Sequence, residues 1–499
     1  MKNLHRLFIL TIFTVLNLVG SQSLTGDRGR LISSELLEHK TAYQIDQALS
    51  GSIIFFRATY GASIYKLIYE TIDPNGEPTL ASGSVTAPKK PTFALPTLSF
   101  QSGPMIKRDA ASSATGFDGG YGIVAMWTAS SGYLTVIPDY LGLGESELFH
   151  PYQMAKPNAT VIIDMLRATR TFCDQEGLET NGQLFLTGYS EGGYTMMAAH
   201  KMIEEEHPEE FTITASAPGA GAYDMSGVMV DLMLSGEEYP SPFYLPYTLF
   251  AFDEYYNLWE SPSDFLKEEY ATLLPPLFDG THSSSEINAA MPAVPMEIME
   301  PDVVDAFSKD ENHPLREALR DNDLYDWAPQ SPMRLFHSTG DDLVPVENSR
   351  LAYETFQENG ATQVELFECD CGTHGEAAAL LLFSGFAWIQ GLTDKSQPLR
   401  VADNITPEGY SLLSVYPSPF NSSTKISFTL NERSDIKISV LDLLGKEVEM
   451  LARGPFPAGH FELPWNASQF AGGLYIITLE RTNFHGMIER HSRKVLYLK

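Results

Sequence analysis

The sequence predicts an α/β protein, with a doubly wound, mostly parallel sheet, a helical cap insertion, and a small all-β sandwich after it. Three observations lead to this order. Short apolar runs alternate with longer helical patterns from about residue 40 to 395. A segment rich in proline, methionine and aromatic residues interrupts them between about residues 222 and 332. Near the end, strand-like alternation continues without helices, and it predicts four strands at Lys425–Leu430, Asp435–Leu441, Gly459–Trp465 and Gly473–Glu480. Such changes of pattern separate fold classes along one chain.

Six apolar runs in the first region have the length and composition of buried strands. They are Thr97–Phe100, Thr135–Ile137, Leu184–Thr187, Phe211–Ala215, Arg334–His337 and Val364–Phe367. Helical patterns, such as residues 159–173 and 193–206, lie between several of them. Strands that alternate with helices form a mostly parallel sheet covered on both faces.

These patterns divide the chain into segments, and the first segment is a basic stretch followed by an apolar run. We expect a signal peptide at 1–23, an α/β domain at 24–395 with its cap at about 222–332, a linker at 396–410 and a β-sandwich at 411–499. The signal begins with Lys2 and Arg6, and its apolar run Leu7–Val19 has 13 residues. That run is too short to cross a bilayer comfortably, so it favours a cleaved export signal over a membrane anchor.

The charge of the chain limits its partners. Acidic residues outnumber basic ones 64 to 33, which gives a formal net charge of −31. Nucleic-acid binding needs a basic surface, so we expect no nucleic-acid partner. We also expect no transmembrane segment in the mature chain, because no later stretch approaches the apolar length of a membrane span.

The three cysteines do not form a disulfide framework. Cys173 lies in a helical pattern and is expected to be buried. Cys369 and Cys371 lie close to His374, but no second cluster at ligand spacing supports a metal site. Two loop thiols or one local disulfide remain open for this pair, and we expect no metal or cofactor.

Gly188-Tyr189-Ser190-Glu191-Gly192 has the G-x-S-x-G pattern of a nucleophile elbow. An apolar strand precedes it and a helical pattern follows, as the elbow requires. The turn is sharp, so the positions two residues before and two residues after the serine must be small. The helix N-terminus behind the serine favours a developing negative charge. Ser190 is therefore the candidate nucleophile.

A serine nucleophile needs a base, and the base needs an acid that orients it. In this type of site the chain order is serine, acid, histidine. Asp341 and Asp342 both follow the strand 334–337, and we favour Asp341 because its spacing fits D-x-x-V-P. His374 follows the next strand and is the candidate base. The rival His337 precedes the acid, which favours a structural role.

An acyl-transfer site also needs two backbone donors for the oxyanion. One is expected to be the amide of Glu191, directly after the nucleophile. The other is expected in the loop after the strand 97–100. Pro104 has no N–H, so we expect Gly103 as the second donor, with Met105 as the alternative.

These residues resemble those of the α/β-hydrolase superfamily. From about Tyr65 to Ser226 the chain is similar to secretory-lipase-like esterases, in Leu98–Gly103, in Ile137-Pro138-Asp139-Tyr140-Leu141-Gly142 and in Gly188–Gly193. The resemblance implies hydrolysis of carboxylic esters, with the insertion between nucleophile and acid acting as a lid. The cap itself does not align, and it sets the substrate.

The last 90 or so residues resemble the type A sorting domain of bacterial type IX secretion. Five pieces carry the resemblance: Tyr416–Asn421, Leu443–Val448, Pro457-Ala458-Gly459, Gly472–Tyr475 and Arg493–Leu496. Ser418 stands where the usual pattern has asparagine. The resemblance implies the type IX secretion machinery as a partner, and a secreted or surface-attached product. A carbohydrate-binding sandwich is the alternative, but no row of aromatic residues stands out there.

Together these features predict a secreted serine hydrolase that cleaves lipid or small-molecule esters through an acyl-enzyme on Ser190. Two alternatives stay open. The first is a serine peptidase on the same fold, although no propeller repeat is present. The second is a non-catalytic surface-binding protein, against which the intact set of Ser190, Asp341 and His374 speaks.

Overall fold

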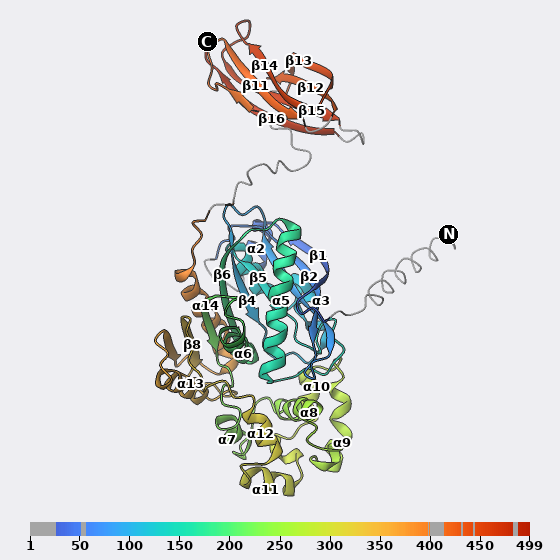
Figure 1. Cartoon of the computed structure of the whole chain (residues 1–499), viewed down its shortest axis with the longest axis vertical. Helices are drawn as coiled ribbons and strands as arrows, with labels where there is room; N and C mark the ends of the chain where they lie inside the picture. Colours follow the sequence, from blue (N-terminus) through green and yellow to red (C-terminus); the bar gives the residue numbers. More distant parts are fainter. Residues whose placement is uncertain are drawn as a thin grey trace, which may run out of the picture. The chain divides into compact units, whose positions relative to one another are not determined.

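The computed structural model describes residues 26–50, 56–397, 399, 414–430, 433–442, 445–482 and 488–499. By their contacts the residues form two compact units, one up to Arg400 and one from Val401 onwards (Figure 1). The predicted signal peptide, residues 1–23, lies outside the described residues, and so does most of the predicted linker, residues 396–410.

The first unit is built on one nine-stranded sheet with the order β1-β2-β3-β5-β4-β6-β7-β8-β9. Strands β4 to β9 run parallel, and β1, β2 and β3 extend the sheet in antiparallel fashion. All six predicted strands are present, whereas β1 to β3 were not predicted. The strands are β1 (Leu31–Lys40), β2 (Ala62–Ile72), β3 (Pro78–Pro88), β4 (Leu95–Gln101), β5 (Leu134–Pro138), β6 (Thr180–Tyr189), β7 (Ile213–Gly219), β8 (Met333–Ser338) and β9 (Val364–Cys369).

Helices cover both faces of this sheet, as predicted (Figure 1). Val136 and Ile137 are neighbours in β5 and point to opposite faces, because side chains alternate along a strand. Val136 packs with Met165 of α5, and Ile137 packs with Ala129 of α4. The helices are α5 (Ala155–Glu176), α6 (Glu191–Glu206) and α13 (Glu347–Glu358) on one face, and α2 (Ala42–Leu49), α3 (Ser112–Thr115), α4 (Gly122–Ser130) and α14 (His374–Leu392) on the other.

Between β7 and β8 the chain forms short helices that gather at one end of the unit (Figure 1). The buried aromatic residues of this segment belong to the same hydrophobic core as α5, α6 and strands β6 to β8, and Phe252, Phe265 and Phe307 are almost fully buried. This arrangement agrees with the predicted cap. The helices are α7 (Val228–Met233), α8 (Tyr244–Tyr256), α9 (Glu268–Leu273), α10 (Ser284–Ala289), α11 (Pro301–Lys309) and α12 (Pro314–Arg320).

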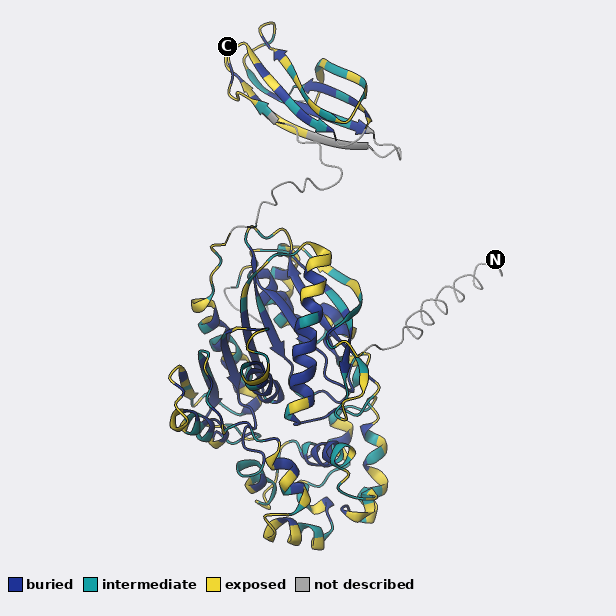
Figure 2. Cartoon of the chain, viewed as in Figure 1, coloured by how far each residue is buried: buried dark blue, intermediate teal, exposed yellow. Residues whose placement is uncertain are grey.

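The second unit is a sandwich of two antiparallel sheets, with the orders β10-β11-β14 and β13-β12-β15-β16. Figure 2 shows buried residues along the strands of this unit, and Ile426, Ile438 and Trp465 belong to its core. Four of the strands were predicted, whereas β10, β13 and β16 were not. The strands are β10 (Ser414–Tyr416), β11 (Ser423–Leu430), β12 (Ser434–Leu441), β13 (Glu447–Phe456), β14 (Gly459–Asn466), β15 (Gly473–Thr482) and β16 (Ile488–Tyr497).

Within the described ranges, α14 alone is long and apolar enough to cross a membrane, judged by length and composition. This is weak evidence for a span, because core helices of soluble proteins have the same composition. Ala377, Leu381 and Phe386 of α14 are almost fully buried against the sheet. We therefore interpret α14 as a core helix of the α/β unit.

A partly buried carboxylate, Glu204, joins the end of α6 to the segment that enters β8. It lies 3.0 Å from His200 Nε2 and accepts hydrogen bonds from the amides of Gln330 and Ser331, both at 2.8 Å. Burial raises the pKa of Glu204, but the hydrogen bond and charge of His200, the Gln330 amide and the Ser331 hydroxyl outweigh it and lower the pKa to about 2.

Because the folded pKa of Glu204 lies below its usual 4.5, its carboxylate stabilises the fold above pH ~4.5, and this stability is lost as pH falls towards 2. We expect Glu204→Gln to lower the free energy of unfolding by about 2 kcal/mol at pH 7, allowing for partial solvent screening. The difference from the wild type should shrink at pH 3 to 4. Urea unfolding across this range measures it, and a constant difference would contradict the assignment.

Candidate active site

Ser190 lies between the end of β6 and the start of α6, at the carboxyl edge of the parallel strands. Its backbone has φ 62°, a region that residues other than glycine seldom adopt. Two hydrogen bonds hold this conformation: the Ser190 amide donates to Gly219 O at 2.9 Å, and Ser190 O accepts from the Tyr194 amide at 3.1 Å. The predicted elbow is thus present, with its serine in a strained turn of the kind found at functional sites.

The glycines of the elbow are required because backbone atoms surround them. A Cβ on Gly188 would lie 2.3 Å from Gly192 O, and one on Gly192 would lie 2.1 Å from Gln101 O. Both contacts are with main chain, which cannot rotate away as a side chain can. The pattern G-x-S-x-G therefore reflects how closely β6, α6 and the loop after β4 approach one another.

Replacing Gly192 with alanine should lower the free energy of unfolding by about 3 kcal/mol, because the new methyl group must push the Gln101 backbone away from α6. Gly391, near the end of α14, is a matched control, because a Cβ there meets nothing within 4 Å. Gly391→Ala should be neutral or stabilise by about 0.5–1 kcal/mol. Urea unfolding measures both changes, and equal stability of the two variants would refute the steric argument.

The structure brings Asp341 and His374 together. Asp341 Oδ2 lies 2.7 Å from His374 Nδ1, and the Asp341 side chain is fully buried. Asp342 is exposed, and its Oδ1 accepts a hydrogen bond from the His374 amide at 3.0 Å. Asp341 therefore forms a hydrogen bond with the imidazole ring of His374, whereas Asp342 forms one with its backbone amide. This geometry fits Asp341 as the acid, which was the favoured alternative.

Asp341 is held as a carboxylate by several donors. Its Oδ1 accepts from the amides of Leu343 and Val344 at 3.0 and 2.8 Å. Burial alone would raise the pKa of Asp341, but hydrogen bonds from His337 and His374 and the charge of His374 hold that pKa well below its usual range. His337 Nε2 lies 2.9 Å from Val344 O and 3.4 Å from Asp341 Oδ2. It therefore supports the acid from behind, which agrees with the structural role predicted for it.

His374 is the first residue of α14 and lies against the residue before the nucleophile. The Tyr189 hydroxyl donates to His374 O at 2.8 Å, and the two rings are 4.8 Å apart. The loop before it is fixed by the Ser338 hydroxyl, which donates to Gly372 O at 2.6 Å. Among the residues described by the structure, the Ser190 hydroxyl has no hydrogen-bond partner; in sites without substrate the bond to the base is often long and tightens on binding.

Cys369 and Cys371 form a disulfide at the end of β9, three residues before His374. Of the two alternatives left open for this pair, the structure has the local disulfide. Cys173 is a buried free thiol, as predicted. Across the described ranges, no group of three or more His, Cys, Asp or Glu side chains is placed to hold a metal ion.

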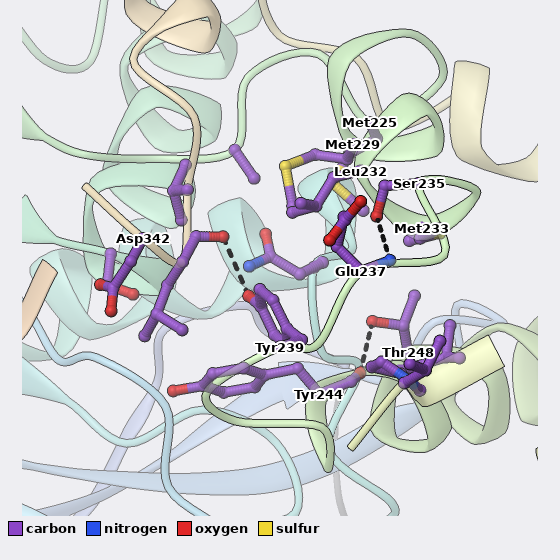
Figure 3. Close-up of a pocket in the computed structure, with 18 of the residues that line it drawn as sticks. Met225, Met229, Leu232, Met233, Ser235, Glu237, Tyr239, Tyr244, Thr248 and Asp342 are labelled. Carbon is purple, nitrogen blue, oxygen red and sulfur yellow. Dashed lines mark hydrogen bonds between the residues drawn. The ribbon is translucent and has the colours of Figure 1, made fainter. Parts of the chain in front are cut away.

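Ser190 lines a cavity of about 140 Å³ under the cap. Figure 3 shows methionines and Leu232 gathered at one side of it and the rings of Tyr239 and Tyr244 at another. Its charged lining residues, among those described, are all acidic: Glu237, Glu238 and Asp342. The cavity is therefore suited to an apolar group that carries no negative charge. Its apolar lining comes from Ala222, Met225, Met229, Leu232, Met233, Leu245, Val294, Pro295, Leu343 and Val344.

The predicted oxyanion donors lie at the elbow. Glu191 begins α6, so its amide is at the helix N-terminus. Gly103 lies beside the elbow, because a Cβ there would be 3.6 Å from Tyr189 O and 3.0 Å from the Tyr121 hydroxyl. Burial raises the pKa of Tyr121 to about 12, while a hydrogen bond from the Gly103 backbone opposes that rise. The Tyr121 hydroxyl therefore lies beside the Gly103 backbone, and the second donor stays a prediction.

Comparisons with known proteins agree with this geometry. The family model described as "Secretory lipase" matches residues 110–398, which is more than half of the chain. The chain belongs to the secretory lipase family. Residues 414–488 match the model of the secretion system C-terminal sorting domain. Both resemblances predicted from the sequence are therefore confirmed, and they indicate an extracellular or cell-surface protein.

Individual relatives are more distant. Lipase 6 of Candida albicans is 23% identical over 270 residues, which cover 52% of this chain and 55% of that protein. The chain thus spans only about half the length of this curated relative.

Solved structures share the α/β fold. A protein from Legionella pneumophila that is described as a "putative hydrolase" has 29% identity and a TM-score of 0.67, over 74% of this chain and 99% of that one. The rice cell wall degrading esterase LipA from Xanthomonas oryzae has 28% identity and a TM-score of 0.65, over 73% and 96%. Candida antarctica lipase A, at 16% identity and a TM-score of 0.58 over 76% and 84%, shows the fold alone.

Proposed function

We propose that the chain is a secreted serine esterase that hydrolyses carboxylic esters through an acyl-enzyme on Ser190. The observation that carries this proposal is the 2.7 Å contact between Asp341 and His374, held beside the strained elbow by Tyr189. Membership of a lipase family and the esterase LipA among the similar structures support the same reaction class.

The proposed reaction is acyl transfer. Asp341 accepts a hydrogen bond from the Nδ1–H group of His374 and so keeps the proton on Nδ1. Nε2 is therefore free to take the proton of the Ser190 hydroxyl as that oxygen attacks the ester carbon. The amides of Glu191 and the Gly103 loop hold the oxyanion. His374 then gives the proton to the leaving alcohol, and water activated by His374 releases the acid. No step needs a metal or cofactor.

The cavity suggests the size and charge of the acyl group. In another protein, a cavity of about 150 Å³ holds one benzene molecule. A cavity of about 140 Å³ would then take roughly six carbons. The acidic lining residues Glu237, Glu238 and Asp342 disfavour an anionic acyl chain. We therefore propose short to medium, uncharged acyl esters as substrates.

Hydrolysis of p-nitrophenyl esters from acetate to palmitate by the mature chain tests the proposal. We expect the highest kcat/KM between butyrate and octanoate, and lower values for palmitate and for a succinate half-ester. A fluorophosphonate should stop turnover and add its mass to the peptide that contains Ser190. A folded protein without turnover on any ester would overturn the esterase proposal, and peptide substrates would then be tested.

A further inference from the structure

A buried acid–histidine pair lies directly behind the proposed nucleophile. Glu191, the residue after Ser190, places Oε1 2.6 Å from Nε2 of His150, and the two side chains are 0% and 2% exposed. Nδ1 of His150 lies 3.0 Å from Leu141 O. From the sequence, Glu191 has a predicted role only through its amide, and His150 has none.

The hydrogen bonds fix the number of protons on this pair. A carbonyl oxygen such as Leu141 O can only accept, so Nδ1 of His150 must carry a proton. The 2.6 Å contact on the other side then has two descriptions: a protonated imidazole donates to a carboxylate, or a protonated Glu191 donates to a neutral imidazole. The net charge of the pair is zero in both.

The surroundings make this neutrality important. The imidazole of His150 stacks on Tyr140, with ring centroids 5.2 Å apart, and Tyr247 lies 5.8 Å away. Glu191 Oε2 is buried and has no hydrogen-bond partner among the described residues. Without His150 the carboxylate would therefore be unpaired in an aromatic environment that screens charge poorly, and burying such a group is costly.

A bare carboxylate here would also oppose the chemistry. The amide of the same residue, Glu191, is the proposed oxyanion donor, so the carboxylate lies within one side-chain length of the negative charge that develops in the transition state. The helix N-terminus stabilises that charge, and an uncompensated negative charge beside it would cancel part of the stabilisation. Tyr140 connects His150 to the same region, because its hydroxyl donates to Ser102 O at 2.8 Å in the loop after β4.

We propose that His150 is a positioning residue of the esterase, which neutralises Glu191 and holds it so that the helix N-terminus can act on the oxyanion. This inference rests on the proposed function of Ser190. It predicts that the loss of kcat on removing His150 comes from the unpaired carboxylate of Glu191. Removing the charge of that carboxylate should therefore restore part of kcat.

The test is a double-mutant cycle with His150→Leu and Glu191→Gln in the mature full chain. We expect His150→Leu to lower kcat about 100-fold, and the double variant His150→Leu/Glu191→Gln to recover at least tenfold of that loss. Thermal unfolding of the same four proteins gives a second readout that needs no substrate: the melting temperature of His150→Leu should also rise when Glu191→Gln is added. If His150→Leu does not fold, His150→Gln fills the space without positive charge, and the same order is expected.

The chain offers a matched control at the far end of α6, where His200 contacts Glu204 at 3.0 Å. These residues are 9 to 13 positions from Glu191, or roughly 14 to 20 Å along the helix. His200→Leu should change stability but move kcat less than threefold, and Glu204→Gln should rescue no activity. A His150→Leu enzyme within threefold of wild type, or a double variant no better than it, would overturn the inference. If the wild type hydrolysed no ester, the proposed function would be contradicted. The melting temperatures would still test the pairing of His150 with Glu191.

Discussion

Replacing Ser190 with alanine should lower kcat for ester hydrolysis by about 10⁶-fold, the size found when the nucleophile of a serine hydrolase is removed. The loss is large because no other group can form the acyl-enzyme, and His374 and the oxyanion donors then have no attacking oxygen to act on. A residual rate of about 10³- to 10⁴-fold over water should remain from the oxyanion hole and substrate binding. Release of p-nitrophenol from p-nitrophenyl butyrate measures the rates of the wild type, of Ser190→Ala and of the uncatalysed reaction.

Ser102 provides the control for this prediction. It lies in the loop after β4, its carbonyl is within 2.9 Å of a Cβ built on Gly192, and its buried hydroxyl has no hydrogen-bond partner among the described residues. Ser102→Ala should keep kcat within about tenfold and should still react with a fluorophosphonate, whereas Ser190→Ala should not react. Labelling that survives in Ser190→Ala would show that another residue is the nucleophile.

The elbow and the proposed acid and base could be predicted from the sequence because their signals are local. The G-x-S-x-G spacing is a direct consequence of the backbone contacts of Gly188 and Gly192, so it is visible without a structure. Asp341 and His374 each follow a short apolar run, and parallel strands bring the residues after them to one edge of the sheet. The order serine, acid, histidine along the chain then indicated which residue is the acid and which is the base.

The three antiparallel strands were not predicted, because their signals are weak. β1 contains serines, glutamates, a histidine and a lysine, and none of its residues is buried. β2 carries buried side chains on both faces, and β3 is rich in small residues, so neither gives the strict alternation of a half-buried strand. They join the rest of the sheet through β3, which pairs with β5, a strand far away in the sequence.

The pair of Glu191 and His150 was also beyond sequence reasoning, for a different reason. The two residues are 41 positions apart, and nothing near His150 marks it as a partner of the elbow. Only the path of the loop after β5, which returns to α6, brings them together. A glutamate directly after the nucleophile was the one available signal, since a buried carboxylate must find a partner.

Asp341→Asn should lower kcat by about 10⁴-fold, because it forces His374 into the wrong tautomer. Oδ1 of Asp341 accepts from the amides of Leu343 and Val344. An asparagine must keep its carbonyl oxygen there, since its NH₂ group would face two donors. The NH₂ group then replaces Oδ2 and points at His374 Nδ1, which must accept. The proton moves to Nε2, and the histidine can no longer take the proton of Ser190.

Asp342→Asn separates this effect from a general loss of negative charge. Among the residues that the structure describes, Asp342 accepts a hydrogen bond only from the His374 amide, at 3.0 Å, and the carbonyl oxygen of an asparagine can accept the same hydrogen bond. We expect this variant to lose at most tenfold in kcat. Because the two substitutions remove the same charge from adjacent residues, their ratio of about 10³ measures the tautomer effect alone. If Asp342→Asn were the more damaging substitution, Asp342 would be the acid, and the 2.7 Å contact of Asp341 with His374 would serve only to hold the loop.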